Sequence, residues 1–220
     1  QSGISLGGIN KIDFKDPAAP EFETLSAPEG YTLVITNTGG SHAALTEHYA
    51  AIKTEMHEVA NFFGKQFLRD VKPEKFYAEI PALRKKVSER AILRACHFYE
   101  ENERVDAAAA ALKSGNTKEF LAAVEASGKS SLNCLQNCFV PGSSEQPVTL
   151  ALPISDRIIK DGAVRVHGGG FAGTILAYLA DAETEGYVAE MGKLFGSENV
   201  FTATVRQPRA IRIGPGELLK

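Results

Sequence analysis

The middle of the chain carries apolar side chains at the spacing of amphipathic helices. From residue 41 to residue 64 they recur at alternating intervals of four and three, which places them on one face of a single helix. They are Leu45, Tyr49, Ile52, Met56, Val59 and Phe63. Ser41 is the expected N-cap of this helix and Gly64 its expected C-cap. The same periodicity predicts helices over residues 74–86, 88–111 and 116–127, the last between Gly115 and Gly128, and helical segments over 130–138 and 144–160.

Both ends of the chain carry the pattern of strands instead. Residues 4–14 alternate like a hairpin with Gly7 and Gly8 at its turn, a connection follows over 15–28, and residues 31–36 read as a short apolar strand. The C-terminal part predicts strands over 163–166, 174–179, 200–205 and 210–213, with a helix over 182–195. This order of elements predicts an α+β fold, in which several helices pack on one face of a mainly antiparallel sheet.

The most distinctive local pattern is a cluster of glycines between two apolar runs. Gly168, Gly169 and Gly170 are consecutive, and Gly173 follows shortly after. Glycine loses much entropy inside a regular element, so the cluster implies special dihedral angles or a close approach to a ligand. Backbone N–H groups in such a loop can bind an anion, although a tight structural hairpin is the alternative. A Walker A motif is excluded, because no Gly-Lys-Ser/Thr follows and the next segment reads as a strand.

Composition narrows the functional classes. The 220 residues are 44% hydrophobic and 23% charged, with a net charge of −3 and no basic block, so we expect neither nucleic acid nor a membrane surface as partner. No apolar run approaches the ~18 residues of a membrane span, and the N-terminal residues lack a signal-peptide layout. The three cysteines, Cys96, Cys134 and Cys138, suit a reducing cytoplasm, and their spacings fit no standard zinc site.

Titratable residues outside the glycine cluster form no recognisable catalytic set. His167 stands alone at a strand end, where a histidine is more often structural than catalytic. Asp13 lies in a predicted strand, and Asp156 with Arg157 reads as an exposed helix pair. The residues by themselves therefore predict no catalytic base and no metal ligand.

Several segments together resemble one enzyme family. Residues 165–173, Arg-Val-His-Gly-Gly-Gly-Phe-Ala-Gly, are similar to the third motif of the GHMP sugar and metabolite kinases, and of galactokinases in particular. Ala172 replaces a glycine of that motif, and His167 stands where a threonine is common. Four further segments resemble galactokinases in the family's order: residues 33–38, 47–49, 94–105 and 127–132.

The beginning of the chain resembles the segment that follows the catalytic aspartate of galactokinases. The family's Met-Asp-Gln motif is matched from Gln1 onward, which places the catalytic Asp, a helper Arg and the phosphate loop upstream of Gln1. The resemblance therefore implies that this chain holds no catalytic residue. It also implies remnant strands of the N-terminal kinase domain over residues 1–36, within a first domain of residues 1–40, and the GHMP kinase C-terminal domain over 41–220.

As a function, the resemblance implies the C-terminal part of a cytoplasmic ATP-dependent sugar kinase. The full-length form would use ATP and Mg²⁺ to convert galactose to galactose 1-phosphate, and this chain alone is expected to be inactive. Tyr49 is the implied sugar contact, although it also lies on the apolar stripe of its helix. The implied loop beside the nucleotide phosphates consists of Gly168, Gly169, Gly170 and Gly173.

Two other functions stay open at this point. A galactokinase-like module without catalysis would sense sugars or nucleotides, and a plain interaction domain would use its glycines only to turn a hairpin. The partners that the kinase reading implies are the sugar, ATP and the missing N-terminal domain. The strands predicted over 4–14 and 31–36 would pair with strands upstream of Gln1. Without those partners a strand edge keeps unpaired backbone groups, so we expect self-association through that edge.

Overall fold

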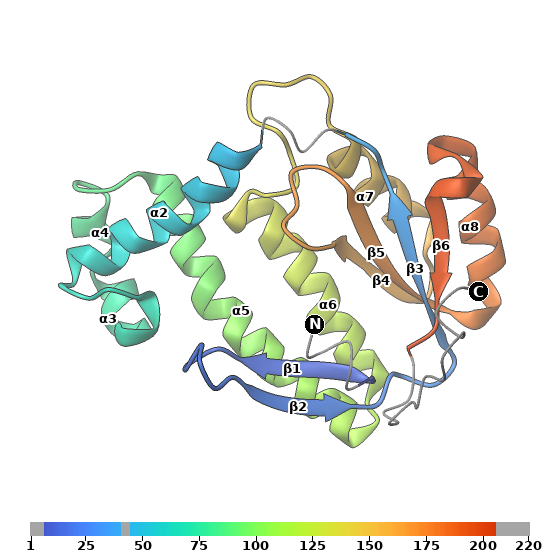
Figure 1. Cartoon of the computed structure of the whole chain (residues 1–220), viewed down its shortest axis with the longest axis horizontal. Coiled ribbons are helices and arrows are strands. Elements are labelled where there is room, and N and C mark those ends of the chain that lie inside the picture. The colour runs from blue at the N-terminus through green and yellow to red at the C-terminus, as the bar shows by residue number, and fades with distance from the viewer. Residues whose placement is uncertain (1–6, 41–44, 206–220) are drawn as a thin grey trace, which may run out of the picture.

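The computed structural model describes residues 7–40 and 45–205 of the chain. In this part, helices pack against two separate sheets, and the smaller sheet lies at the margin of the molecule (Figure 1). The strands are β1 (Ile9–Asp13), β2 (Glu21–Leu25), β3 (Tyr31–Asn37), β4 (Gly162–Val166), β5 (Thr174–Ala180) and β6 (Val200–Ala203). The α-helices are α2 (Thr46–Phe62), α3 (Pro73–Ala78), α4 (Ile80–Leu83), α5 (Glu89–Ser114), α6 (Thr117–Ser130), α7 (Pro147–Ile158) and α8 (Asp181–Phe195). The π-helical turn η2 (Ser131–Leu135) follows α6, and the 3-10 turns are η1 (Leu68–Asp70) and η3 (Ser197–Asn199).

The larger sheet has four antiparallel strands in the order β4-β5-β3-β6. Alternate residues of β5 are fully buried on the face that packs against α7 and α8: Ile175, Ala177 and Leu179. The opposite face packs against α6, where the rings of Phe120 and Tyr178 meet edge to face with centroids 5.1 Å apart. The α+β class and the mainly antiparallel sheet are confirmed, and α6 adds a helix on the second face.

β3 lies inside this sheet, between β5 and β6 (Figure 1). Its Val34 is fully buried, and Thr36 stands opposite Ile175 on one side and Val200 on the other. The expectation that this strand pairs upstream and leaves a bare edge is therefore wrong, because both of its neighbours come from the C-terminal part. A domain boundary after residue 40 stays a proposal. β3 lies before that boundary, but its strand partners β5 and β6 lie after it.

The smaller sheet is the antiparallel pair β1 and β2. The turn predicted at Gly7 and Gly8 is wrong, because both glycines precede β1 and the connection between the strands spans residues 14–20. β2 lies in the segment 15–28 that was expected to be a connection without a strand. Pro17 and Pro20 lie in this connection, where they need not donate a hydrogen bond to a neighbouring strand. The five residues after Pro20 form β2. Residues 4–6 lie outside the described part of the chain.

The predicted helices form, and several of their ends follow capping residues. At the start of α5 the Ser88 Oγ accepts a hydrogen bond from the backbone N–H of Ala91, at 3.1 Å. At the start of α6 the Asn116 Oδ1 accepts one from the N–H of Glu119, at 3.2 Å. Between the two helices Gly115 adopts a left-handed φ of 68°, which is the usual helix-ending conformation.

Some helix boundaries differ from the prediction. α6 continues through Gly128, which was expected to end it. The helix expected over 74–86 is divided into α3 and α4, because Pro81 restricts the preceding residue and lacks an N–H. The expected N-cap at Ser41 and the final strand over 210–213 lie outside the described residues.

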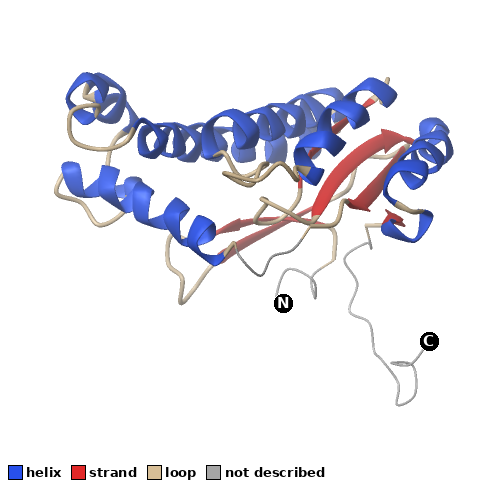
Figure 2. Cartoon of the chain, turned by 90° about the horizontal axis from the view of Figure 1, so that it is seen from above, coloured by secondary structure: helices blue, strands red, loops and turns tan. Residues whose placement is uncertain are grey.

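A second core joins α2 and α5 to the short helices α3 and α4, away from the larger sheet (Figure 2). Phe76 and Leu83 are fully buried there. The Tyr99 hydroxyl donates to the backbone oxygens of Leu68 and Val71, and burial raises its pKa to about 12. Within residues 7–40 and 45–205, no helix has the length and apolar character that a membrane crossing needs.

Candidate functional site

The glycine loop, residues 167–173, joins β4 to β5. Its base is closed by the His167 N–H, which donates to the Thr174 oxygen at 2.9 Å. Gly168, Gly170 and Gly173 have φ angles of 69°, 79° and 94°, a backbone conformation that side chains disfavour. Backbone conformation therefore favours glycine at three of the four glycine positions of the loop, as the sequence predicted.

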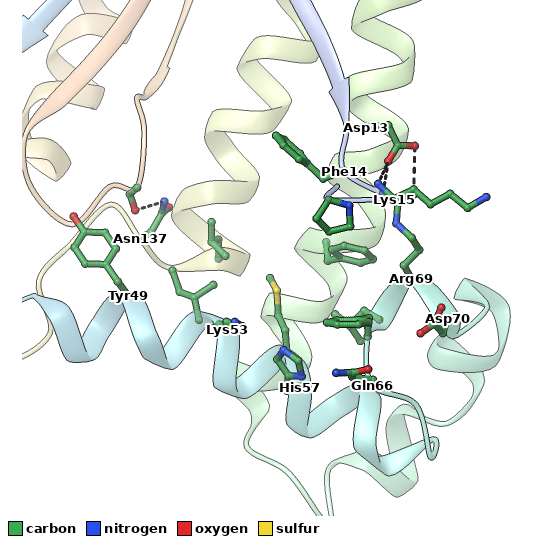
Figure 3. A pocket seen from close by; sticks show the side chains of 18 of the residues that line it. Asp13, Phe14, Lys15, Tyr49, Lys53, His57, Gln66, Arg69, Asp70 and Asn137 are labelled. Atoms are coloured by element: carbon green, nitrogen blue, oxygen red, sulfur yellow. Dashed lines mark hydrogen bonds and ion pairs between the residues drawn. The ribbon is translucent and has the colours of Figure 1, made fainter. Parts of the chain in front are cut away.

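Asn137 and Tyr49 hold the loop from two sides (Figure 3). The Asn137 side-chain amide donates to the Gly169 oxygen at 3.0 Å, and the main-chain oxygen of Asn137 accepts from the Phe171 N–H. The Tyr49 hydroxyl, on α2, donates to the Gly170 oxygen at 2.8 Å. The loop is thus fixed by elements far apart in sequence.

The fit around the loop leaves no space for side chains at two glycines. A Cβ on Gly169 would lie 2.7 Å from Cε1 of the Tyr49 ring, and one on Gly170 would lie 2.1 Å from the Asn137 oxygen. Real Cβ atoms do not approach other atoms so closely. Close packing, and not only the sign of φ, therefore requires glycine at both positions.

The loop presents unused hydrogen-bond donors. Within the described part of the chain, the N–H groups of Gly168, Gly169 and Gly170 donate to no acceptor. Gly168 and Gly169 are exposed and line a cleft. Consecutive unpaired N–H groups attract anions, because each carries a partial positive charge.

Phe171 anchors the far side of the loop. It is 1% exposed and adopts a φ of 62°, which is unusual for a residue with a side chain. Its ring meets the Tyr49 ring edge to face, with centroids 5.2 Å apart. Burial raises the pKa of Tyr49, so its hydroxyl stays protonated at neutral pH.

The cleft beside the loop has a volume of about 1170 Å³ and extends from the loop along α2 to the end of β1 (Figure 3). Its apolar wall includes Phe14, Ile52, Met56, Phe67, Leu68 and Phe98. Polar side chains also reach it, among them Lys53 and His57 from α2 and Asn137 beside the loop. Such a cleft, apolar with a few polar groups, is typical of a small-molecule site.

Asp13 lines the far end of the cleft but is engaged structurally. Its carboxylate accepts a hydrogen bond from Arg69 Nη2 at 2.7 Å and one from the Lys15 N–H at 2.8 Å. The hydrogen bond from Arg69 is the main cause that lowers the pKa of Asp13. A carboxylate held in this way is a poor general base.

A buried ion pair supports the segment that carries Asn137. Arg94 on α5 is 3% exposed, and its Nη1 donates to the Glu55 carboxylate on α2 at 2.8 Å. Its Nε donates to the Leu135 oxygen at 3.1 Å, at the end of η2. Gln136 then takes a left-handed φ of 58°, which reverses the chain and brings Asn137 to the loop.

A second polar network lies under β4, the strand that leads into the loop. Glu101 accepts hydrogen bonds from the Ser127 hydroxyl and from Arg104 Nε, the latter at 2.8 Å, and its carboxylate lies 3.6 Å from Arg165 Nη1. Burial by itself would raise the pKa of Glu101, but these hydrogen bonds outweigh it and the pKa is lowered. Glu101 is therefore a charged group that ties α5, α6 and β4 together.

The structure brings together the residues singled out in the sequence. Tyr49 lies against Gly169 and Gly170, although α2 and the loop are more than a hundred residues apart. Gly173 lies at the loop base, where its oxygen accepts hydrogen bonds from the N–H and the hydroxyl of Thr38, both at 2.7 Å. Asn137 was missed by sequence reasoning. Its only signal is a polar residue at the end of a helical segment, directly before the buried Cys138.

The cysteines and metal ligands offer no second centre in the described residues. Cys96, Cys134 and Cys138 are free thiols, and burial raises the pKa of Cys138 to about 12, so it is no nucleophile at neutral pH. In residues 7–40 and 45–205, no group of three or more His, Cys, Asp or Glu side chains is placed to hold a metal ion.

In sequence the chain is similar to galactokinases. No family model matches the chain. The chain is 32% identical over 181 residues to a galactokinase of Actinobacillus pleuropneumoniae serotype 5b (strain L20), a match that covers 82% of this chain and 46% of the relative. It is 32% identical over 186 residues to a galactokinase of Haemophilus influenzae (strain PittEE), covering 79% and 44%. The chain therefore spans slightly less than half the length of these curated relatives.

Solved structures show a similar fold. The structure of Lactococcus lactis galactokinase complexed with galactose matches 86% of this chain and 48% of that protein, with a TM-score of 0.69 and 20% identity. A mevalonate diphosphate decarboxylase from Staphylococcus aureus matches 93% of this chain with a TM-score of 0.52 and 9% identity. At these identities the likeness concerns the fold, which is the mixed helical and antiparallel arrangement expected from the sequence.

Proposed function

This chain is galactokinase-like, with the fold of the GHMP kinases, and from that premise we propose that it forms the C-terminal part of an ATP-dependent sugar kinase. Galactose is the proposed sugar, because the relatives that match the chain are galactokinases. A cytoplasmic location belongs to the proposal, since all three cysteines are free and suit a reducing compartment.

The observation that carries this proposal is the glycine loop at the end of the cleft. Three consecutive N–H groups, from Gly168 to Gly170, donate to no acceptor in the described residues, and Tyr49 lies directly against the loop. In a structural hairpin water would satisfy the exposed donors, but here Gly168 and Gly169 line a cleft of ligand size, which favours a bound ligand. An anion such as a nucleotide phosphate would satisfy them.

Phosphoryl transfer depends mostly on positioning and on stabilisation of charge. In the proposed reaction, the loop N–H groups bind phosphate oxygens and hold the nucleotide against the sugar. Mg²⁺, when bound, neutralises charge on the phosphates, and the described residues offer no cluster of ligands for it. We therefore propose that the metal is held by ATP and by groups in the half of the relatives that this chain does not match.

Tyr49 is the proposed sugar contact at the loop. Its hydroxyl donates to the Gly170 oxygen, which places the polar end of the side chain at the loop, and a tyrosine oxygen is also able to accept a hydrogen bond from a sugar hydroxyl. Its raised pKa, which results from burial, keeps that hydroxyl neutral. The residue thus fits both interpretations from the sequence, because its ring packs on Phe171 while its polar end reaches the loop.

The proposal is tested by galactose-dependent ADP formation. Two proteins are compared, this chain alone and a fusion in which the unmatched half of the A. pleuropneumoniae galactokinase precedes it. We expect no turnover from the chain alone and turnover on the order of 1–100 per second from the fusion. Tyr49→Phe in the fusion should raise the KM for galactose, because it removes a sugar contact.

Tyr77→Phe on the exposed side of α3 is the matched control and should leave KM unchanged. A folded fusion that binds galactose or ATP but never forms ADP would contradict the kinase proposal and favour a sensing module. Turnover by the chain alone at kinase rates would contradict the proposal that phosphoryl transfer needs the unmatched half.

A further inference from the structure

Asn137 holds two successive peptide groups of the glycine loop in opposite orientations. Its side-chain amide donates to the Gly169 oxygen, and its main-chain oxygen accepts from the Phe171 N–H. The first bond draws one carbonyl toward Asn137, and the second draws the next N–H toward it. Asn137 is 3% exposed, so these bonds are shielded from water.

The orientation of the first peptide group decides where the Gly170 N–H points. The Gly169 oxygen and the Gly170 N–H belong to one peptide group, and in a trans peptide these two groups point in opposite directions. Because the Gly169 oxygen is bound to Asn137, the Gly170 N–H points away from Asn137. It finds no acceptor among the described residues. Gly170 is itself buried, directly behind Gly169, which lines the cleft.

Without this hold, the peptide group could turn over at little cost. It is flanked by Gly169 and Gly170, and glycine tolerates both signs of φ. A turned peptide would direct its oxygen, in place of its N–H, at an incoming anion. The loop sequence alone therefore does not determine whether the loop attracts or repels phosphate.

We propose that Asn137 is a positioning residue, which keeps the Gly169–Gly170 peptide turned so that the Gly170 N–H is available to a phosphate group. This inference rests on the proposed function, since it assigns the orientation of donors in the same loop. Tyr49 fixes the next peptide group, because its hydroxyl donates a hydrogen bond to the Gly170 oxygen at 2.8 Å. The buried Arg94, bound to the Leu135 oxygen, keeps the end of η2 in place behind Asn137.

A structural experiment tests the orientation without any ligand. Crystal structures of the chain are compared for Asn137→Asp and for Asn133→Asp, which introduces the same charge at an exposed position on η2. In the first variant a carboxylate faces the Gly169 oxygen, so we expect the peptide to turn over and direct the Gly170 N–H at the carboxylate. The second should keep the original orientation. An unturned peptide in Asn137→Asp would overturn the proposal.

A binding experiment tests the consequence. Inorganic phosphate is titrated into the ¹⁵N-labelled chain while the Gly170 amide resonance is followed by NMR. The neutral variant Asn137→Leu should weaken phosphate binding by about tenfold or more, because a hydrogen bond to a charged acceptor is lost. Asn133→Leu should stay within about twofold.

The outcomes separate this inference from the proposed function. Equal phosphate binding by the wild type and by a folded Asn137→Leu variant would overturn the positioning role. If the wild type binds no phosphate, the proposed phosphate site is wrong. A turned peptide in Asn137→Asp would still show that Asn137 sets the orientation of the Gly169–Gly170 peptide. Because the two variants differ in chemistry, failure of one to fold leaves the other decisive.

Discussion

Gly168 and Gly170 share a left-handed backbone but differ in their surroundings. Their φ angles are 69° and 79°, yet a Cβ on Gly168 would meet no atom within 4 Å, whereas one on Gly170 would lie 2.1 Å from the Asn137 oxygen. Backbone strain acts at both positions, and steric exclusion acts only at the second. The two glycines therefore separate the two reasons for which a loop needs glycine.

We expect Gly168→Ala to lower the free energy of unfolding by about 1 kcal/mol, the cost of a side chain at positive φ. Gly170→Ala should lower it by about 3 kcal/mol, since Asn137 must also be displaced. Urea unfolding of both variants measures the difference. Equal losses would mean that the contact with Asn137 has no energetic weight.

His97 is a buried titratable residue on α5, away from the glycine loop. Its Nδ1 lies 2.9 Å from the Ser130 hydroxyl. Burial lowers the pKa of His97 below its ordinary value of 6.5, and Glu101 opposes this shift, while Arg104 and Arg165 add to it. The folded protein therefore holds this imidazole neutral at a pH where the unfolded chain would protonate it.

This difference predicts how stability depends on pH. Between the lowered pKa and 6.5 the unfolded chain binds more protons, so the free energy of unfolding should fall as the pH drops below about 6.5. His97→Gln should flatten that fall. Urea unfolding between pH 7 and pH 5 tests this, and an identical slope for His97→Gln and the wild type would refute the assignment.

At the scale of elements, the contact between α6 and β4 depends on the absence of one side chain. A Cβ on Gly128 would lie 2.9 Å from the Val164 oxygen and 3.3 Å from the Arg165 Cα. Helix propensity favours alanine over glycine at such an interior position, so this close approach opposes the local preference. The close approach explains why a glycine stands inside α6, where the sequence predicted a helix end.

A matched pair of substitutions tests which effect prevails. Gly128→Ala should lower the free energy of unfolding by about 1–3 kcal/mol, because two backbone segments must separate. Gly186→Ala on α8, where a Cβ would meet no atom within 4 Å, should raise it by about 0.5–1 kcal/mol through helix propensity alone. Stabilisation by both substitutions would show that α6 can move away from β4 without cost.

At the scale of the whole molecule, the hairpin β1–β2 stands apart from the larger sheet. It is joined to α5 by ion pairs, Lys11 with Asp106 and Lys113 with Glu23. Within the described residues its two strands pair only with each other, so their outer edges carry unpaired backbone groups. Large apolar side chains are exposed beside them, with Phe14 61% exposed.

Self-association through these edges stays a prediction. We expect concentration-dependent dimerisation of the chain, since an open strand edge beside exposed rings is a template for pairing. Phe22→Lys on β2 should weaken it at least about tenfold, because a lysine on an edge strand opposes pairing. Leu194→Lys, at an exposed site on α8, is the control. Sedimentation that shows only monomer at all concentrations would contradict the prediction.

The sequence predicted what depends on local periodicity and on glycine chemistry. The apolar stripe of α2, the helix starts near Ser88 and Asn116 and the loop between β4 and β5 were all expected and are present. Pairing partners of strands were not predictable in the same way. β3 joins β5 and β6, and β1 joins β2, because pairing depends on which segments meet in space.

The sequence by itself therefore determined the α+β class, most helices, and the requirement for glycine around residues 168–173. Only the tertiary structure decided that Tyr49 and Asn137 hold that loop, since one lies on α2 and the other follows η2. It also decided why a glycine stands inside α6 at Gly128, because β4 occupies the space a side chain would need. The physical reason is the same in each case: periodicity depends on neighbours along the chain, whereas hydrogen-bond partners and close contacts depend on neighbours in space.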